Sequence, residues 1–400
     1  MTSVKTALVI GAGIAGPVTA LALRKAGIEA TVYEAYPAAA TGLGGVFMVA
    51  PNGLAALRIV GVDAAVRDIG QPIARMLIGD GNGRRFGEFA NLPGLPNLVM
   101  WRAELNRVVH DAAVAAGIGL EYGKRLVGAR DGRTGITAEF ADGSTATADV
   151  LVGADGIRSA VRTLIDPEAV GPQYVGLLGV GGFGGPGEPS PAEPEAMHFA
   201  FGKRAFFGYW TLPDGRTGWF SNLPHERPVP MAEARRVPNG DWLRQLRSAH
   251  ADDRPAREVL RHADPAELIV VGSLEILPKV RHWHRGRMVL VGDAAHAPSS
   301  SSGQGASLSI ESAVQLARCL RDLSDPAAAF PAYERLRRDR VEKIAANAAK
   351  NNRQKAFGPL GSAVMSLAMP LATRTFLKPA KMLGPVHNYR IDWAETVTAG

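Results

Sequence analysis

Residues 6–16 of the chain read TALVIGAGIAG, an apolar run followed at once by three closely spaced glycines. The run Thr6–Ile10 is typical of a buried strand, and the apolar periodicity of residues 14–26 predicts a helix that Gly27 would end. A second apolar run, Ile28–Tyr33, follows. The order strand, glycine turn, helix, strand predicts a βαβ unit at the start of the chain.

The glycine turn and the acid after the second strand together indicate a dinucleotide site. Glycine lets the backbone turn tightly and lets a pyrophosphate approach the positive N-terminus of the helix. Glu34 ends the second strand, where a carboxylate can bind ribose hydroxyls, which favours FAD or NAD over NADP. The alternative is a tight turn with only a structural purpose. The candidate binding residues are Gly11, Gly13, Ile14, Ala15, Gly16 and Glu34.

The composition is that of a globular chain: of 400 residues, 46% are hydrophobic and 21% are charged. It excludes collagenous, disordered and disulfide-scaffold proteins, and the length predicts two or three domains. A single cysteine, Cys319, allows no internal disulfide and no cysteine metal cluster, which favours a reducing compartment. Since neither a signal peptide nor a membrane-spanning stretch is recognisable, we expect a cytoplasmic protein. We also expect that it binds no metal and no nucleic acid.

The net charge of +7 is concentrated near the C-terminus. Residues 331–400 contain 12 lysines and arginines against 5 acids, so the first 330 residues are neutral. We interpret this excess as a solvated helical face. Attraction of an anionic coenzyme is an alternative, and contact with a membrane surface is a less favoured one. The oligomeric state stays open.

The pattern of strands and helices changes twice along the chain. Short aromatic strands joined by tight turns fill the middle, and alternating strand and helix signals lie on both sides. The expected fold is α/β, with a Rossmann-like domain interleaved with an antiparallel β-sheet domain and followed by C-terminal helices. The expected boundaries are residues 1–70, 97–170 and 275–330 for the first domain, 71–96 and 171–274 for the sheet domain, and 331–400 for the helical segment.

Three strands of the sheet domain are predicted at Ala196–Phe201, Ala205–Leu212 and Gly218–Leu223. The segment Gly181–Glu195, rich in glycine and proline, is expected to be a mobile loop. Because successive side chains of a strand point to opposite faces, Phe199 and Phe201 should share one face and His198 the other.

Two later motifs favour FAD over NAD. Leu151–Arg162 (LVGADGIRSAVR) and Val289–His296 (VLVGDAAH) each place an acid, Asp155 or Asp293, at the carboxyl end of an apolar strand. Ligands of parallel sheets lie along that edge. Two acids there, far apart in the sequence, indicate an extended ligand that is held along its length.

With these three ordered motifs the chain resembles the FAD-dependent aromatic hydroxylase family, the single-component flavoprotein monooxygenases related to p-hydroxybenzoate hydroxylase. The resemblance covers nearly all of residues 1–330 and implies FAD as cofactor. It implies that Asp155 lies where flavin and nicotinamide pass, that Asp293 binds the ribityl chain, and that Arg102 reaches the pyrophosphate or ribityl region. It further places Gly44 and Gly45 beside the flavin ring and the backbone of Val127 beside adenine.

The segment after Gly292 and Asp293 departs from the family's pattern. The resemblance places Gly303, Gly305, Ala306 and Ser307 at a helix start that faces the flavin pyrimidine edge. The family's Pro-Pro pair beside flavin C4a is Ser299-Ser300 here, and its Asn is Ser307. This substitution predicts a freer loop. His296, in the same motif, is expected to be a buried structural histidine rather than a base.

The family's chemistry implies the reaction and its partners. NADPH or NADH, bound transiently, would reduce FAD, and O2 would then form a flavin C4a-hydroperoxide. This species would hydroxylate or epoxidise an aromatic or polycyclic small molecule, in secondary metabolism or aromatic breakdown. Aromatic side chains of the sheet domain are the candidate substrate pocket, namely Phe199, Phe201, Tyr209 and Trp219.

Three other functions are compatible with a FAD-binding chain. A flavin-dependent halogenase is disfavoured because its Trp-x-Trp-x-Ile-Pro signature is absent. A FAD-linked dehydrogenase or reductase of the same fold is the main enzymatic alternative. A non-catalytic flavin-binding protein is the third.

Overall fold

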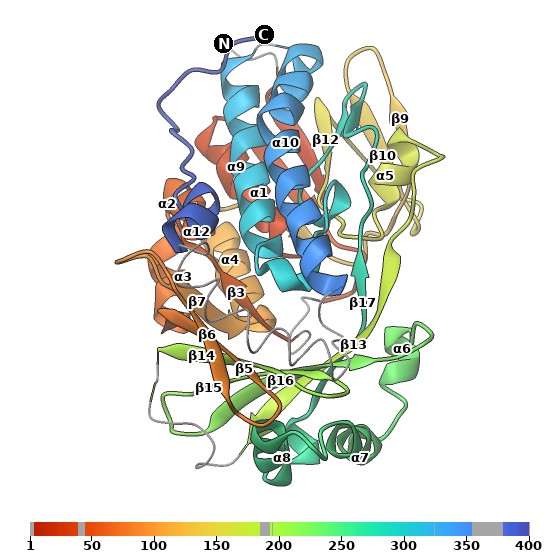
Figure 1. The fold of residues 1–400 in the computed structure, drawn as a ribbon. Coiled ribbons are helices and arrows are strands. Elements are labelled where there is room, and N and C mark those ends of the chain that lie inside the picture. The colour runs from red at the N-terminus through yellow and green to blue at the C-terminus, as the bar shows by residue number, and fades with distance from the viewer. Residues whose placement is uncertain are drawn as a thin grey trace.

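The computed structural model describes residues 4–38, 45–184, 193, 195–323, 325–353 and 379–399. Gly44 and most of the predicted loop at 181–195 lie outside this set. The expected α/β fold is confirmed. A six-stranded sheet with helices packed on it occupies one end of the molecule, and a seven-stranded sheet occupies the other (Figure 1).

The βαβ unit forms as predicted, from β1 (Thr6–Ile10), α1 (Ala15–Lys25) and β2 (Glu29–Tyr33). β1 and β2 pair in parallel, and Gly27 takes the left-handed φ of +80° that lets the chain reverse after α1. The six-stranded sheet has the order β18-β19-β12-β1-β2-β8. Its other strands are β8 (Gly119–Glu121), β12 (Val150–Gly153), β18 (His284–Arg285) and β19 (Met288–Leu290).

Helix α9 (Gly305–Asp322) packs against both α1 and α10 (Pro326–Arg353) (Figure 1). Most side chains of α9 are buried, so this helix forms the centre of the larger hydrophobic core. The remaining helices of this end are α2 (Pro51–Ile59), α3 (Asp63–Ile69), α4 (Arg102–Ala115), α5 (Ala160–Ile165) and α12 (Pro379–His387), with 3-10 turns η2 (Gly292–Ala294) and η3 (Ser300–Ser302).

Two three-stranded sheets complete this end of the molecule. One has the order β3-β7-β4, and the other is the antiparallel sheet β11-β10-β9. Their strands are β3 (Val46–Val49), β4 (Gln71–Ile73), β7 (Asn97–Trp101), β9 (Leu126–Asp131), β10 (Ile136–Phe140) and β11 (Thr145–Ala148). The C-terminal tail returns to α9, where the Val397 amide donates to Asp322 at 2.8 Å.

The seven-stranded sheet has the order β17-β13-β16-β15-β14-β5-β6. Its strands are β5 (Arg75–Asp80), β6 (Arg85–Ala90), β13 (Gln173–Gly184), β14 (Ala196–Phe201), β15 (Phe206–Thr211), β16 (Thr217–Pro224) and β17 (Ile269–Ile276). Helices α6 (Met231–Ala234), α7 (Asn239–Ala249) and α8 (Arg254–Arg261) and the turn η1 (Pro265–Glu267) connect β16 to β17. A second hydrophobic core lies between this sheet and α7 and α8.

The prediction of a loop beginning at Gly181 was wrong for its first four residues. Residues 181–184 continue β13 and pair with β16. Their glycines allow close packing: a Cβ on Gly182 would lie 3.0 Å from the Trp219 ring, and one on Gly184 would lie 3.1 Å from Val259. Glycine here makes room for neighbours and does not mark a turn.

Candidate active site

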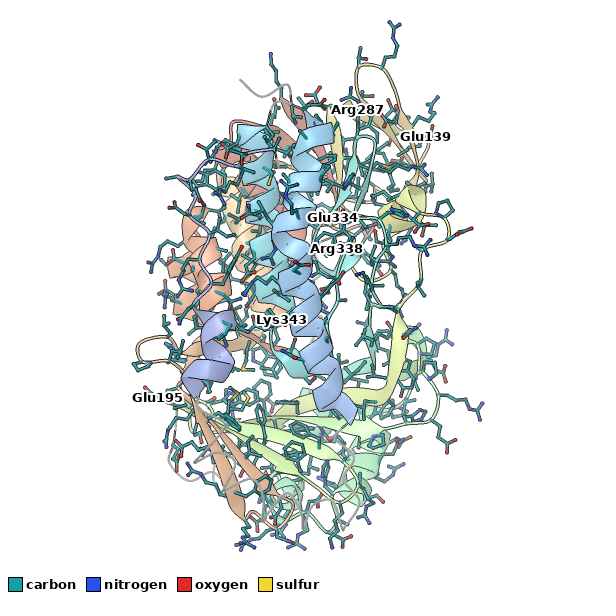
Figure 2. All side chains as sticks on the ribbon, turned by 45° about the horizontal axis from the view of Figure 1, so that its top comes forward. Glu139, Glu195, Arg287, Glu334, Arg338 and Lys343 are labelled. Atoms are coloured by element: carbon teal, nitrogen blue, oxygen red, sulfur yellow. The ribbon has the colours of Figure 1, made fainter. Side chains whose placement is uncertain are left out.

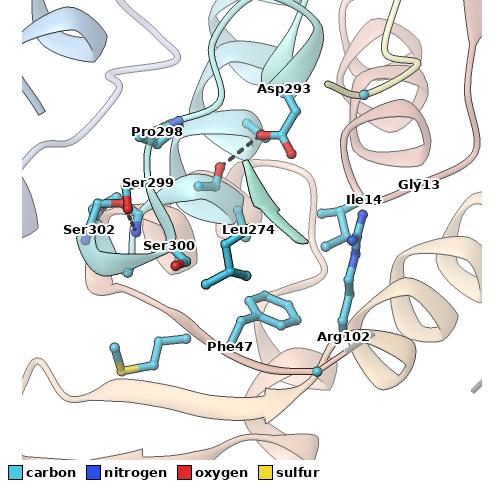
Figure 3. Close-up of a pocket in the computed structure, with 18 of the residues that line it drawn as sticks. Gly13, Ile14, Phe47, Arg102, Leu274, Asp293, Pro298, Ser299, Ser300 and Ser302 are labelled. Carbon is cyan, nitrogen blue, oxygen red and sulfur yellow. Dashed lines mark hydrogen bonds between the residues drawn. The ribbon is translucent and has the colours of Figure 1, made fainter. Parts of the chain in front are cut away.

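A cavity of about 1910 Å³ is lined by the βαβ unit, by the two later motifs and by the seven-stranded sheet. Drug-sized ligands occupy pockets of about 300–1,000 Å³. The cavity is therefore large enough for a dinucleotide and a second ligand together. Figure 3 shows part of its wall.

The three glycines of the first turn have different roles. Gly11 has φ of +103°, and a Cβ there would lie 2.6 Å from the Ala154 carbonyl oxygen. A Cβ on Gly16 would lie 1.8 Å from the Gly11 carbonyl oxygen. A Cβ on Gly13 would meet no protein atom within 4 Å, because Gly13 faces the cavity. Gly11 and Gly16 are thus required by the fold, and Gly13 leaves room for a ligand.

Glu34 is held against the glycine turn. Its Oε2 accepts a hydrogen bond from the Ala12 amide at 2.8 Å, and its Oε1 accepts one from the Tyr36 amide at 3.0 Å. Each carboxylate oxygen has a second lone pair. Since Glu34 also lines the cavity, that acceptor capacity is available to ribose hydroxyls.

Arg102 and Asp293 both reach into the cavity, from α4 and from η2 (Figure 3). The Arg102 amide donates to the Gly45 carbonyl at 3.2 Å, which joins the start of α4 to the segment before β3. Burial raises the pKa of Asp293, and the positive charge of Arg102 opposes that rise. A desolvated carboxylate gains from hydrogen-bond donors, which the hydroxyls of a ribityl chain supply.

The serine segment forms a hydrogen-bonded turn and not an unrestrained loop. Ser299 Oγ accepts a hydrogen bond from the Ser301 amide at 3.3 Å, and the hydroxyls of Ser299 and Ser301 hydrogen-bond to each other at 3.0 Å. Ser302 Oγ accepts one from the Gln304 amide at 3.1 Å, and Gly303 takes the left-handed φ of +59°. The Ser301 hydroxyl also donates to the Ala348 carbonyl of α10 at 3.2 Å. Hydroxyl contacts thus restrain the turn where the family's prolines are missing.

The N-terminus of α9 faces the cavity through Gly305 and Ala306. Ser307 does not line the cavity. Its Oγ accepts a hydrogen bond from the Ala50 amide at 3.0 Å and packs against Gly53. Gly292, with φ of +60°, lies where a Cβ would be 3.0 Å from Ala15, so it allows η2 to approach α1.

The second motif is joined to the third by a buried arginine. Both carboxylate oxygens of Asp155 accept hydrogen bonds at the start of α5, from the Ser159 hydroxyl and the Ala160 and Val161 amides. Arg162 donates to the Ala294 carbonyl at 3.1 Å and to the Ile157 carbonyl at 2.8 Å. Asp155 lines the cavity, but its carboxylate mainly holds its own motif together. Arg162 was not among the predicted site residues, although the motif that contains it was recognised.

Val127 is not among the residues that line the cavity and is 60% exposed, and the approach of its backbone to adenine stays a prediction. Lys124, Arg125 and Leu126 line this end instead, together with Tyr36. The Arg125 guanidinium lies 5.9 Å from the Tyr36 ring centroid. No motif spacing indicated these side chains, because their approach to Tyr36 depends on how β9 follows β8.

Phe199 and Phe201 line the cavity, and His198 lies on the opposite face of β14, stacked on Tyr209 at 4.7 Å. Two other candidates for the substrate pocket require correction. Tyr209 and Trp219 are buried in the core that packs against α7 and α8, where burial raises the pKa of Tyr209 to about 12. Strand alternation brings their neighbours Phe206 and Phe220 to the cavity instead.

His296 is a buried structural residue, as expected, and Cys319 is buried as well. His296 Nε2 hydrogen-bonds to the Ser312 hydroxyl at 2.9 Å, and burial lowers the pKa of His296 to about 3, so the ring stays neutral. Burial raises the pKa of Cys319 to about 12. Within the described ranges no group of three or more potential ligands is placed to bind a metal ion, and no helix is long and apolar enough to span a membrane.

A family model described as "FAD binding domain" matches residues 4–348. The chain belongs to the FAD-dependent aromatic hydroxylase family. Its members are flavoprotein monooxygenases, a class of oxidoreductases.

Relatives of this flavoprotein act on different aromatic molecules. It is 32% identical over 350 residues to the aurachin C monooxygenase/isomerase of Stigmatella aurantiaca, a match that covers 85% of this chain and 87% of that protein. It is 31% identical to a FAD-dependent urate hydroxylase of Klebsiella pneumoniae, covering 86% and 88%. The crystal structure of Klebsiella pneumoniae HpxO with FAD and uric acid has a TM-score of 0.83 and 26% identity, covering 95% and 97%.

The residues of the cavity fit FAD. Gly13 leaves open space at the N-terminus of α1, where a pyrophosphate binds, and Glu34 presents acceptors beside it. Figure 3 shows Asp293 between Gly13 and Ile14 on one side and the serine turn on the other. This order follows the order adenosine, pyrophosphate, ribityl chain and flavin along the cofactor.

We expect Asp293→Ala to weaken FAD binding by about 10- to 100-fold, because the ribityl hydroxyls would lose a charged acceptor. The measurement is the flavin content of purified protein and the Kd for added FAD. Asp68→Ala is the control, since Asp68 is an exposed acid of α3 outside the cavity. Equal flavin affinity in the two variants would contradict the assignment of Asp293.

Proposed function

We propose that the protein is a monooxygenase that uses NADPH or NADH and O2 to oxidise an aromatic or polycyclic small molecule. In the balanced reaction, substrate, O2, NAD(P)H and a proton give hydroxylated substrate, NAD(P)+ and water. The observation that carries the proposal is the continuous cavity. Its FAD-binding residues and its aromatic sheet residues face one space, with the serine turn and Phe47 beside it. Relatives named for the oxidation of aurachin C and urate support it.

Bound FAD, held by the residues of the glycine turn, Glu34, Arg102 and Asp293, would supply the redox chemistry, which is hydride acceptance from the nicotinamide and activation of O2. The chain's own contribution is electrostatic and steric. The first-turn amides of α9 form the positive end of a long helix, which stabilises negative charge placed next to it. Arg102 adds a fixed positive charge to the same cavity.

Exclusion of water is the second contribution. Met48, Phe199, Phe206, Phe220 and Leu274 are apolar cavity residues, and they leave few polar groups near the reacting atoms. A dry wall limits the loss of activated oxygen to solvent and holds the substrate close to it.

The test is stopped-flow absorbance of the FAD-loaded protein, reduced anaerobically and then mixed with O2 and aromatic compounds. We expect a transient absorbance between those of reduced and oxidised flavin, followed by oxygenated product. Product formed under anaerobic conditions with an artificial electron acceptor would indicate a dehydrogenase instead. Bound FAD that no NAD(P)H reduces would indicate a non-catalytic flavoprotein.

A further inference from the structure

The seven-stranded sheet lines its part of the cavity without any ionisable side chain among the described residues. Where the structure describes the chain, the charged residues of the cavity come from the FAD-binding end or from α10 and α12. The sheet's contribution is aromatic, aliphatic and amide in character. It consists of Met76, Ile78, Phe89, Gly179, Val180, Gly181, Met197, Phe199, Phe201, Phe206, Phe220, Ser221, Asn222, Val271 and Leu274.

Three of these phenylalanines form an aromatic cluster on the cavity face. The ring centroids of Phe199 and Phe206 are 5.6 Å apart, those of Phe206 and Phe220 are 6.0 Å apart, and those of Phe199 and Phe220 are 6.4 Å apart. Gly208 lies between Phe199 and Phe220 in the register, and a Cβ there would be 2.4 Å from the Phe220 ring. The Phe220 ring therefore lies over the strand and presents a flat apolar surface.

Asn222 is the polar side chain next to this cluster. It follows Phe220 by two residues on β16, so it lies on the same face, between Phe206 on one neighbouring strand and Gly179 on the other. The structure shows no hydrogen bond from its amide group to the described residues, and Asn222 is only 6% exposed. Asn222 lines the cavity, and its amide atoms are not among the enclosed polar atoms that lack a partner, so a ligand group can reach the amide and pair with it.

Ser221, the residue before Asn222, already has hydrogen-bond partners within the protein. Ser221 points to the opposite face, where its hydroxyl hydrogen-bonds to His250 Nε2 at 2.9 Å and to the Phe206 carbonyl at 3.1 Å. His250 Nδ1 pairs in turn with Asp253 at 3.0 Å. This Ser–His–Asp chain is fully buried and joins β16 to the segment between α7 and α8, so it offers neither a nucleophile nor a ligand contact.

The cationic residues across the cavity do not provide a clamp for a carboxylate on the sheet. Arg340 is engaged by Glu311 at 2.9 Å and by the carbonyls of Pro385 and Val386, both at 3.0 Å. Lys343 also lines the cavity, but it is exposed and lies on α10, above the sheet and not on it (Figure 2). Water screens such a charge strongly.

We propose that the substrate is an uncharged aromatic molecule that lies on the Phe199–Phe206–Phe220 cluster and bonds through one hydroxyl or carbonyl group to the Asn222 amide. This inference rests on the proposed function and names the substrate class of that site. An anionic substrate would lose its hydration against the sheet without gaining a charged partner from the described part of that sheet. A neutral ring system loses little hydration free energy when it binds, and it covers the apolar surface of the cluster.

The test compares methyl 6-hydroxy-2-naphthoate with 6-hydroxy-2-naphthoate, which share a ring system and differ in charge. Each is titrated into oxidised, FAD-loaded protein, and the Kd is read from the change in the flavin absorption spectrum. We expect the ester to bind at least about tenfold more tightly. A carboxylate that binds as tightly as the ester would overturn the inference.

Variants locate the contact. Asn222→Leu should weaken ester binding about tenfold, because one hydrogen bond is lost. Asn347→Leu, which removes an amide from the α10 wall, should leave the Kd for the ester unchanged. Asn222→Ala serves as a second variant should leucine lower the FAD content. Loss of affinity in Asn347→Leu but not at residue 222 would place the substrate on α10 and refute the assignment to the sheet.

The two proposals can fail separately. Binding is measured on oxidised protein without NAD(P)H, so a preference for the ester can be found even where no oxygen transfer occurs. Conversely, oxygenation of the carboxylate in preference to the ester would support the proposed monooxygenase activity. The same result would refute the inference that the substrate is uncharged.

Discussion

Gly13→Val is expected to yield a folded protein that purifies without FAD. A valine side chain at this position would meet no protein atom near its Cβ, so packing is retained. It would instead occupy the space at the N-terminus of α1 that the pyrophosphate needs, and we expect FAD affinity to fall by more than about 100-fold. Visible flavin absorbance gives occupancy, and circular dichroism with thermal unfolding reports whether the fold is intact.

Two further glycine variants make this result specific. Gly171→Val adds the same side chain at an exposed loop glycine, also without a neighbour within 4 Å, and should keep wild-type flavin content. Gly16→Ala should destabilise the fold itself, since its Cβ would lie 1.8 Å from the Gly11 carbonyl oxygen. Wild-type flavin occupancy in Gly13→Val would show that the pyrophosphate does not pass over this turn.

The largest expected loss of stability comes from Glu311, at the centre of a buried polar network. Its carboxylate pairs with Arg337 at 2.6 Å and with Arg340 at 2.9 Å, and it accepts a hydrogen bond from the Asn52 amide at 2.7 Å. Asn52 also donates to Gln304, the residue before α9, at 3.0 Å. Glu311 and Arg337 are both 0% exposed, so each charge depends on the other.

Glu311→Gln should lower the free energy of unfolding by about 3–5 kcal/mol, because Arg337 would remain buried without a full negative charge beside it. The measurement is urea-induced unfolding of both proteins. Glu342→Gln is the matched control. Glu342 lies on α10 and pairs with Lys279 and Arg338, but its side chain is 32% exposed. We therefore expect this substitution to lower the free energy of unfolding by less than about 1 kcal/mol. Equal losses in the two variants would contradict the buried network.

The effect of Glu311→Gln should also depend on pH. Burial opposes the charged form, but Arg337 and Arg340 outweigh it and hold the pKa of Glu311 below its ordinary 4.5. A lowered acid pKa contributes stability that is fully present above the unfolded-state value and is lost as the pH falls through the folded-state value. The difference between wild type and variant should therefore shrink as the pH is lowered below about 4.5. A difference that stays constant in acid would show that the charge of Glu311 contributes nothing.

The motifs of the FAD-binding end were recognisable because their requirements are local. Gly11 and Gly16 are needed within a few residues of one another, and Glu34 lies at the end of the strand that follows. Such constraints can be recognised from residues that are close together in the sequence. The ends of α1 were predicted within one residue for the same reason, since the apolar periodicity of residues 14–26 and the glycine that follows are both local signals.

The serine turn shows what a comparison of motifs leaves out. The replacement of prolines by Ser299 and Ser300 predicts a freer segment, which stays a prediction. The structure adds hydroxyl contacts within the turn and with Ala348. The second of these contacts is made across 47 residues of sequence. The residue types of the motif do not indicate this contact.

The sequence alone sufficed for the α/β class, the dinucleotide turn and the order of the three motifs, because each depends on neighbours along the chain. Only the tertiary structure showed that Phe206, Phe220 and Asn222 face the cavity while Tyr209 and Trp219 face α7 and α8. Alternation tells which side chains share a face, but the face that meets the cofactor is chosen by what packs on each side. The pairing of Glu311 with Arg337 and Arg340 likewise arose from the packing of α9 against α10, a contact that no local pattern encodes.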